Sequence, residues 1–122
     1  MKVKIDTKEI FHVITIEETL ISANMTGDLT QMLLPFIKSP INNIVVKLNT
    51  VAEINLIIAQ TLLHLQQTFY ENNCSFVICE LQKGVLDFFY RSELLEALNF
   101  APTESEAWDI VQMEEIEREF LH

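Results

Sequence analysis

The side chains that could act as nucleophiles or metal ligands are few and lie far apart in the sequence. The three histidines are His12, His64 and His122. No two of them are four residues apart, which is the spacing of a metal-binding pair on one helix. We therefore expect surface histidines. Cys74 and Cys79 have no base near them in the sequence that would activate a thiol. The residues thus predict no catalytic residue and no metal ligand.

The two cysteines lie in one apolar run. Five residues apart on a strand, Cys74 and Cys79 would point to opposite faces and could not form a disulfide with each other. We expect two buried thiols in a reducing compartment, and therefore a cytoplasmic protein.

Glycine is scarce, and this limits the cofactors that the chain can bind. Gly27 and Gly84 are the only two. A dinucleotide fingerprint needs three glycines within six positions, and a P-loop needs two glycines followed by lysine. We expect no cofactor and no enzyme activity, although a catalytic site assembled from distant residues stays open.

The net charge of −10 excludes other functions. An acidic chain attracts neither nucleic acid nor anionic lipid unless it carries a local basic patch. Lys2, Lys4 and Lys8 alternate with Asp6 and Glu9, so no such patch is evident. No apolar stretch reaches the roughly 18 residues that a membrane span requires, and no apolar leader follows the first residue. We expect no nucleic-acid partner and no insertion into a membrane.

More than half of the negative excess falls in one predicted terminal helix, from 104 to about 120. Thr103 and Glu106 match a capping box at its start. Its acidic residues are spaced around a helix and not along a calcium-binding loop, so we expect a solvated face. They are Glu104, Glu106, Asp109, Glu114, Glu115, Glu117 and Glu119.

The elements that must position any site follow from the apolar periodicity. Two runs rich in β-branched residues, 3–5 and 10–16, predict an N-terminal hairpin. Apolar residues at helical spacing over 29–37 predict a helix that kinks or ends at Pro35. The segment 85–100 indicates a short helix and an apolar return to the core.

The centre of the chain predicts a strand, a helix and a strand. Residues 44–48 and 75–81 are apolar and typical of buried strands, and 56–70 form an amphipathic helix. Asn55 is placed to cap this helix. A right-handed crossover of this kind joins parallel strands. We therefore predict one α/β domain over 1–122, with a mixed sheet of four or five strands and about four helices, mostly on one face.

Residues 44–59, with the order of elements around them, resemble the STAS domain family, the anti-sigma factor antagonists and their relatives. That family has a loop of the form Val-x-x-Ile/Met-Asp-Ser-Ser-Gly-Leu entering a helix. Here the corresponding loop reads Val-Ala-Glu-Ile-Asn-Leu-Ile-Ile-Ala over 51–59. Leu94, Leu98 and Phe100 also match the apolar return that the family shows. The resemblance extends over nearly the whole chain and implies a STAS-like fold.

The main departure from the family lies at the start of this helix. The serine that accepts phosphate in phosphoregulated members corresponds to Ile57, and the serine before it corresponds to Leu56. Asn55 stands for the aspartate and Ile58 for the glycine. Because Ile57 has no hydroxyl group, the resemblance implies no phosphoacceptor at this position.

Periodicity places Ile57 on the polar side of its helix, where its side chain would be exposed. With Leu56 and Ile54 it could form a small apolar patch, a feature that often marks a protein interface. A scattered apolar residue is the plainer explanation. We expect the partner-binding residues to be Glu53, Ile54, Asn55, Leu56 and Ile57.

The resemblance implies a non-catalytic regulatory module that binds a cytoplasmic protein partner, such as an anti-sigma factor or a related serine kinase. An alternative is a STAS subunit of a membrane transport complex that binds the ATPase of that complex. A sensor of a small ligand or nucleotide also stays open, as does a homodimer.

Overall fold

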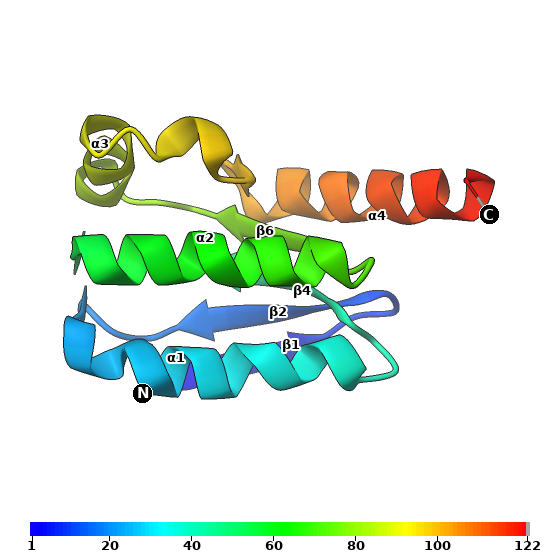
Figure 1. Ribbon diagram of the computed structural model, residues 1–122, viewed down its shortest axis with the longest axis horizontal. Helices are drawn as coiled ribbons and strands as arrows, with labels where there is room; N and C mark the ends of the chain where they lie inside the picture. Colours follow the sequence, from blue (N-terminus) through cyan, green and yellow to red (C-terminus); the bar gives the residue numbers. More distant parts are fainter. Residues whose placement is uncertain (122) are drawn as a thin grey trace.

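The computed structural model describes residues 1–121. These residues fold into a mixed sheet with helices on both faces (Figure 1). The main sheet has five strands in the order β1-β2-β4-β6-β7. These strands are β1 (Val3–Thr7), β2 (Phe11–Ile16), β4 (Asn43–Lys47), β6 (Phe76–Cys79) and β7 (Phe100–Ala101). The described residues also form four α-helices, which are α1 (Thr26–Leu33), α2 (Leu56–Glu71), α3 (Lys83–Arg91) and α4 (Glu104–Phe120).

The predicted hairpin and crossover are both confirmed. Strands β1 and β2 pair antiparallel, with Val3 opposite Ile16. Strand β4 pairs in parallel with β2 and with β6, and β7 extends the sheet in parallel beyond β6. The β4-α2-β6 unit is therefore the parallel centre of the sheet.

Short elements complete the chain. The predicted break at Pro35 is confirmed, because α1 stops at Leu33 and the chain tightens into a 3-10 helix over Leu34–Lys38. Two further 3-10 helices span Ala23–Met25 and Leu95–Ala97. A second sheet of two short parallel strands, β3 (Leu20–Ile21) and β5 (Glu53–Ile54), was not predicted.

Two cores lie on the two faces of the main sheet. The larger core includes the inner faces of α1, α2 and α3, with Leu29, Leu62 and Phe89 fully buried. The smaller core lies under α4 and includes Ala107 and Val111. Three helices thus cover one face and α4 covers the other. This arrangement confirms the expectation of helices mostly on one face.

The cysteines lie on opposite sides of the sheet. Cys74 belongs to the larger core and Cys79 to the smaller one, and both are buried and free. The predictions of buried thiols and of no mutual disulfide are confirmed.

Candidate functional site

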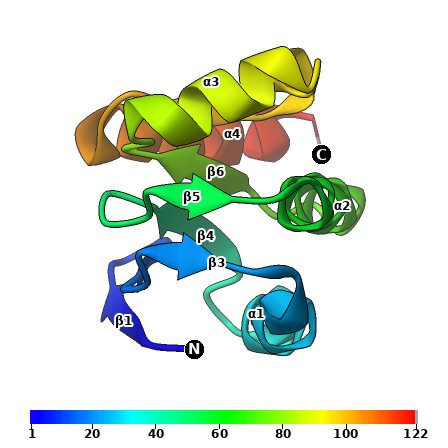
Figure 2. The same cartoon turned by 90° about the vertical axis from the view of Figure 1, so that its left-hand side faces the viewer.

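The small β3–β5 sheet holds the loop that precedes α2. Leu20 pairs with Glu53, and Ile21 pairs with Ile54. Because side chains alternate along a strand, the two pairs point to opposite faces. Ile21 and Ile54 are buried, whereas Leu20 and Glu53 are exposed. Figure 2 shows both strands at the end of the molecule where α2 begins.

Helix α2 begins with the predicted cap. The backbone N–H of Ile58 donates to Oδ1 of Asn55 over 3.0 Å. Asn55 itself has extended backbone geometry, as an N-cap residue requires. This cap fixes the direction in which the first turn of the helix leaves the loop.

The first two residues of α2 present apolar side chains to solvent. Leu56 is 47% exposed and Ile57 is 52% exposed, so the predicted exposure of Ile57 is confirmed. The next two residues, Ile58 and Ala59, are fully buried. Leu56 and Ile57 follow the exposed Glu53 by three and four residues, and Glu53 pairs with the exposed Leu20. We call these four residues the α2-start patch.

Not every predicted site residue contributes to this surface. Ile54 is only 5% exposed and packs in the larger core, so the expectation that it belongs to an exposed apolar patch is wrong. Its β5 register with Ile21 explains this burial. Asn55 is half-buried and committed to its cap. Ile54 and Asn55 thus position the patch without being part of its surface. The other three predicted residues, Glu53, Leu56 and Ile57, belong to the patch.

Sequence reasoning missed Leu20. Its separation from the α2-start loop along the chain hides the connection, which depends on the pairing of β3 with β5. The only available signal was the Leu20–Ile21 pair itself, two apolar residues between polar segments.

The threonines near the loop have structural roles. The hydroxyl of Thr50 donates to the carbonyl of Ile16 over 3.0 Å. The hydroxyl of Thr61 donates to the carbonyl of Ile57 over 2.7 Å. Glu53 is the only charged side chain in the α2-start patch. The patch can therefore bury apolar area against another molecule, and it offers one carboxylate at its rim.

One prediction about the histidines is wrong. His12 is buried on β2, where its Nδ1 lies 2.8 Å from the hydroxyl of Thr7 and its Nε2 lies 3.1 Å from the carbonyl of Ile41. Both ring nitrogens thus have partners, which makes burial tolerable. His64 is exposed, as expected, and His122 lies outside the described residues.

The acidic face of α4 is only partly solvated. The Tyr70 hydroxyl donates to the two carboxylate oxygens of Glu114 over 2.8 and 3.1 Å, and burial raises the pKa of Tyr70. Glu115 accepts from Asn43 and from Arg118. These contacts correct the expectation of a wholly solvated face, because Glu114 ties α4 to Tyr70 of α2 and Glu115 ties α4 to Asn43 of β4. The Thr103 half of the predicted capping box is present, since the Glu106 N–H donates to Thr103 Oγ1 over 3.2 Å.

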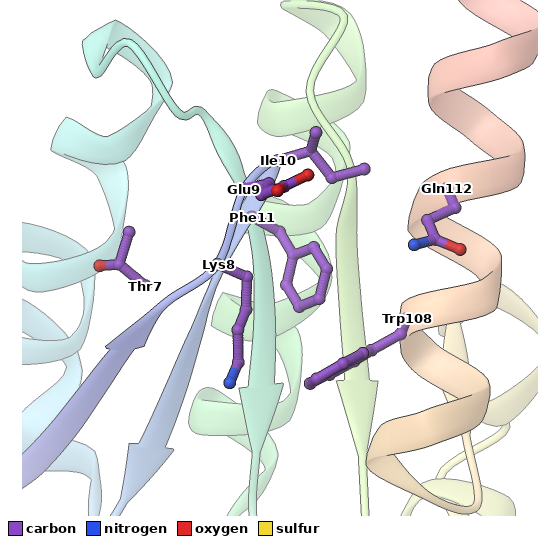
Figure 3. Close-up of a pocket in the computed structure, with 7 residues that line it drawn as sticks. All are labelled: Thr7, Lys8, Glu9, Ile10, Phe11, Trp108 and Gln112. Atoms are coloured by element: carbon purple, nitrogen blue, oxygen red, sulfur yellow. The ribbon is translucent and has the colours of Figure 1, made fainter.

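A shallow hollow of about 550 Å³ lies between the β1–β2 turn and α4 (Figure 3). Its walls include Lys8, Phe11, Trp108 and Gln112. The Lys8 ammonium lies 5.0 Å from the centre of the Trp108 ring, a favourable cation–π distance. The indole Nε1 of Trp108 is buried without a hydrogen-bond partner in the described chain.

Two features are absent from residues 1–121. No group of three or more His, Cys, Asp or Glu side chains in this range is arranged to hold a metal ion. None of the helices in the same range combines the length and the apolar character needed to cross a bilayer.

The fold and the site define a class of protein. It is a small α/β domain with an antiparallel hairpin at one edge, a parallel crossover in the centre and an exposed apolar helix start beside the crossover. The chain belongs to the STAS domain family, whose model matches residues 2–107. No curated protein sequence matches the chain.

Solved structures share this fold at low sequence identity. An anti-sigma factor antagonist from Mycobacterium paratuberculosis superposes with a TM-score of 0.78 and 13% identity, over 91% of this chain and 93% of that chain. The Bacillus cell fate determinant SpoIIAA in its phosphorylated form has a TM-score of 0.64 and 12% identity, over 90% and 99% of the two chains.

A domain within a much larger protein also shares the fold. The murine Solute Carrier 26 family member A9 anion transporter matches with a TM-score of 0.72 and 11% identity. The match covers 88% of this chain and 18% of the transporter. At such identities these likenesses establish the fold, and the predicted STAS-like α/β architecture is confirmed.

Proposed function

We propose that this protein is a non-catalytic regulatory module that binds a cytoplasmic protein partner through the α2-start patch. The observation that carries the proposal is the exposure of Leu56 and Ile57 on a helix start that Asn55 holds in place. Neighbouring apolar side chains on a rigid element lose little conformational freedom on binding, so their burial contributes directly to affinity. Residues 1–122 act as one STAS domain in this proposal.

The partner class that we favour is an anti-sigma factor or a related serine kinase. STAS family membership and the likeness to an anti-sigma factor antagonist support this choice. The buried free thiols suit a reducing cytoplasm.

Binding in this proposal is not switched by phosphorylation at the start of α2. Ile57 occupies the position that corresponds to the phosphoacceptor in phosphoregulated relatives, and its side chain carries no hydroxyl. A phosphate there would add negative charge that disrupts an apolar contact. Without that switch, the patch keeps its apolar character at all times.

A second candidate is a STAS subunit of a membrane transport complex. The likeness to a domain of an anion transporter supports this second candidate function. The same patch would then contact the ATPase of the complex. Both candidates require an apolar contact at Leu56 and Ile57, and they differ in the partner.

The test compares Ile57→Asp with His64→Asp. Both substitutions add one carboxylate to an exposed position of α2, and only the first lies in the patch. Candidate partners from the neighbouring genes, an anti-sigma factor kinase or a transporter ATPase, are titrated against each purified variant by calorimetry. We expect Ile57→Asp to weaken binding by at least about tenfold, which is about 1.4 kcal/mol, with His64→Asp unchanged.

The alternatives give distinct results. Equal affinity of the two variants for a bound partner would show that the patch is not the docking site. A sensor would bind none of these proteins, and a small molecule would raise its melting temperature instead. At 100 times its dissociation constant, such a ligand would add about 2.7 kcal/mol of stability.

A further inference from the structure

Helix α4 carries a second exposed apolar surface, far from the α2-start patch. Met113 is 61% exposed, Ile116 is 53% exposed and Phe120 is 85% exposed. These three residues recur at i, i+3 and i+7, which places them along one face of the helix. We call them the α4 stripe. In Figure 1 the end of α4 extends past the other elements, at the opposite end of the molecule from the start of α2.

The α4 stripe is not needed to hold the helix on the sheet. The packed face of α4 contains Ala107 and Val111, both fully buried in the smaller core. Arg118, seven residues after Val111, continues this face and donates to Ser75 and Asn43. The stripe lies on the opposite side of the helix. Large apolar side chains exposed together in this way are typical of an interaction surface.

The charges around the stripe determine what kind of partner fits it. Asp109 and Glu117 lie four residues before and after Met113, so they share its face, and Glu119 flanks it. All three are exposed. Arg118 is the only basic residue of α4, and it is turned toward the sheet, where it lies 3.0 Å from Glu115. The outer face of α4 therefore combines an apolar stripe with negative charge that forms no ion pair within residues 1–121.

A second copy of the chain does not match this surface well. Two α4 helices packed stripe to stripe would bring Asp109, Glu117 and Glu119 of both copies close together, with no cation between them. Each chain also carries a net charge of −10. Like charges placed together across an interface oppose association. The occupant has to bring positive charge.

We infer that the α4 stripe binds a basic amphipathic helix, with the apolar side of that helix against Met113, Ile116 and Phe120 and its Lys or Arg side chains beside Asp109 and Glu117. Two helices that pack along their apolar stripes bury them from water. Seven residues of helix span about 10 Å, so two turns of the partner helix cover the stripe. This surface is separate from the proposed docking site at α2, and the two can be occupied together.

The probe for the test is an 18-residue fluorescein-labelled peptide of leucine and lysine with helical apolar spacing. A peptide with glutamate in place of every lysine is its matched control. Binding to the full chain is followed by fluorescence anisotropy at low and high salt. We expect the leucine–lysine peptide to bind, and we expect its affinity to fall as the salt concentration rises, because salt screens exposed charges. We expect no binding of the leucine–glutamate peptide.

Variants separate a specific site from a general attraction to an acidic protein. Ile116→Ser with Phe120→Ser keeps every charge and should weaken binding of the basic peptide by at least about tenfold. Asp109→Asn with Glu117→Gln should weaken it less and reduce its salt dependence. Leu56→Ser with Ile57→Ser alters the other surface and should leave binding unchanged. Circular dichroism verifies that each variant is folded.

Three results would overturn the inference. One is equal peptide affinity for the wild type and for the Ile116→Ser, Phe120→Ser variant. Another is equal binding of the leucine–glutamate peptide. The third is a dimer in sedimentation equilibrium that this double variant abolishes, which would identify a second copy as the occupant. None of these results depends on whether Ile57 binds a partner, so the proposed function stands or fails separately.

Discussion

The side chains of Asn43 and Glu115, 72 residues apart in the sequence, are joined by a hydrogen bond of 2.8 Å from Nδ2 to Oε1. The same amide group donates to the carbonyl of Ile10 over 2.9 Å. Its oxygen accepts from the backbone N–H of Ser75 over 2.7 Å and from Arg118 over 3.2 Å. Asn43 thus connects the hairpin, the start of β4, the start of β6 and α4, and it is buried.

Replacing Asn43 should therefore destabilise the whole fold. In Asn43→Ala the Ser75 N–H, the Ile10 carbonyl and the Glu115 carboxylate each lose a partner. We expect the free energy of unfolding to fall by about 2–3 kcal/mol, since a buried polar group left without a partner costs about 1–3 kcal/mol. Urea denaturation measures this loss. Asn42→Ala, at the less buried neighbouring position, should change stability little; an equal loss would contradict the role of Asn43.

The Glu115 carboxylate should make stability depend on pH. The hydrogen bond from Asn43, and after it the contact with Arg118, lower the pKa of Glu115 from its ordinary value of 4.5. A carboxyl group whose folded pKa is lowered stabilises the folded state fully above its unfolded pKa. That contribution is lost as the pH falls through the folded value. Stability should therefore decline below about pH 4.5.

The variant Glu115→Gln isolates this contribution. It should be less stable than the wild type at pH 7, and the difference should shrink as the pH falls below the ordinary glutamate pKa. Glu117→Gln, which replaces an exposed carboxylate of the same helix, should track the wild type across the range. Urea titrations between pH 2 and pH 7 measure all three. A constant difference between Glu115→Gln and the wild type would contradict the assigned cause.

The cap of α2 should contribute measurably to stability. Asn55→Ala removes the acceptor of the Ile58 N–H, and we expect a loss of about 1 kcal/mol in the free energy of unfolding. Asn55→Asp should keep most of it, because a carboxylate accepts the same hydrogen bond. Gln67→Ala on the exposed side of α2 is the control. Thermal denaturation that fails to separate Asn55→Ala from Gln67→Ala would show that the cap is dispensable.

The two thiols should be inert in the folded protein. Burial raises the pKa of Cys79 to about 12, and burial also raises the pKa of Cys74. The thiolate is the reactive form, so at pH 7.5 a disulfide reagent should label neither until denaturant unfolds the chain. Tyr90→Cys places a thiol at an exposed position and should be labelled at once. Rapid labelling of native Cys79 would disprove the assigned environment.

Local patterns were sufficient for the N-terminal hairpin, the central crossover and the four α-helices of the fold. The alternation of β-branched residues predicted the hairpin, and the change from an apolar run to a 3.6-residue period predicted the β4-α2-β6 crossover. The Asn55 cap was predicted from position alone and is confirmed. Such features depend on residues a few positions apart, and these can be identified directly in the sequence.

Pairings between distant segments could not be predicted from the sequence. The β3–β5 sheet buries Ile54, adds Leu20 to the surface and fixes which side of the loop faces solvent. The contacts of His12, Glu114 and Glu115 likewise come from residues far along the chain. A two-residue strand has no periodicity to recognise, and a histidine or glutamate looks the same in sequence whether its partner is water or a buried amide.

The sequence alone establishes the order of the hairpin, the crossover and the four α-helices, the apolar side chain at Ile57 and the concentration of acidic residues in α4. These depend on residue type and on local spacing. The folded structure was needed to show that the start of α2 and the end of α4 lie at opposite ends of the molecule (Figure 1). The reason is physical: the parallel crossover sets the direction of α2, while α4 packs on the other face of the sheet and extends past it.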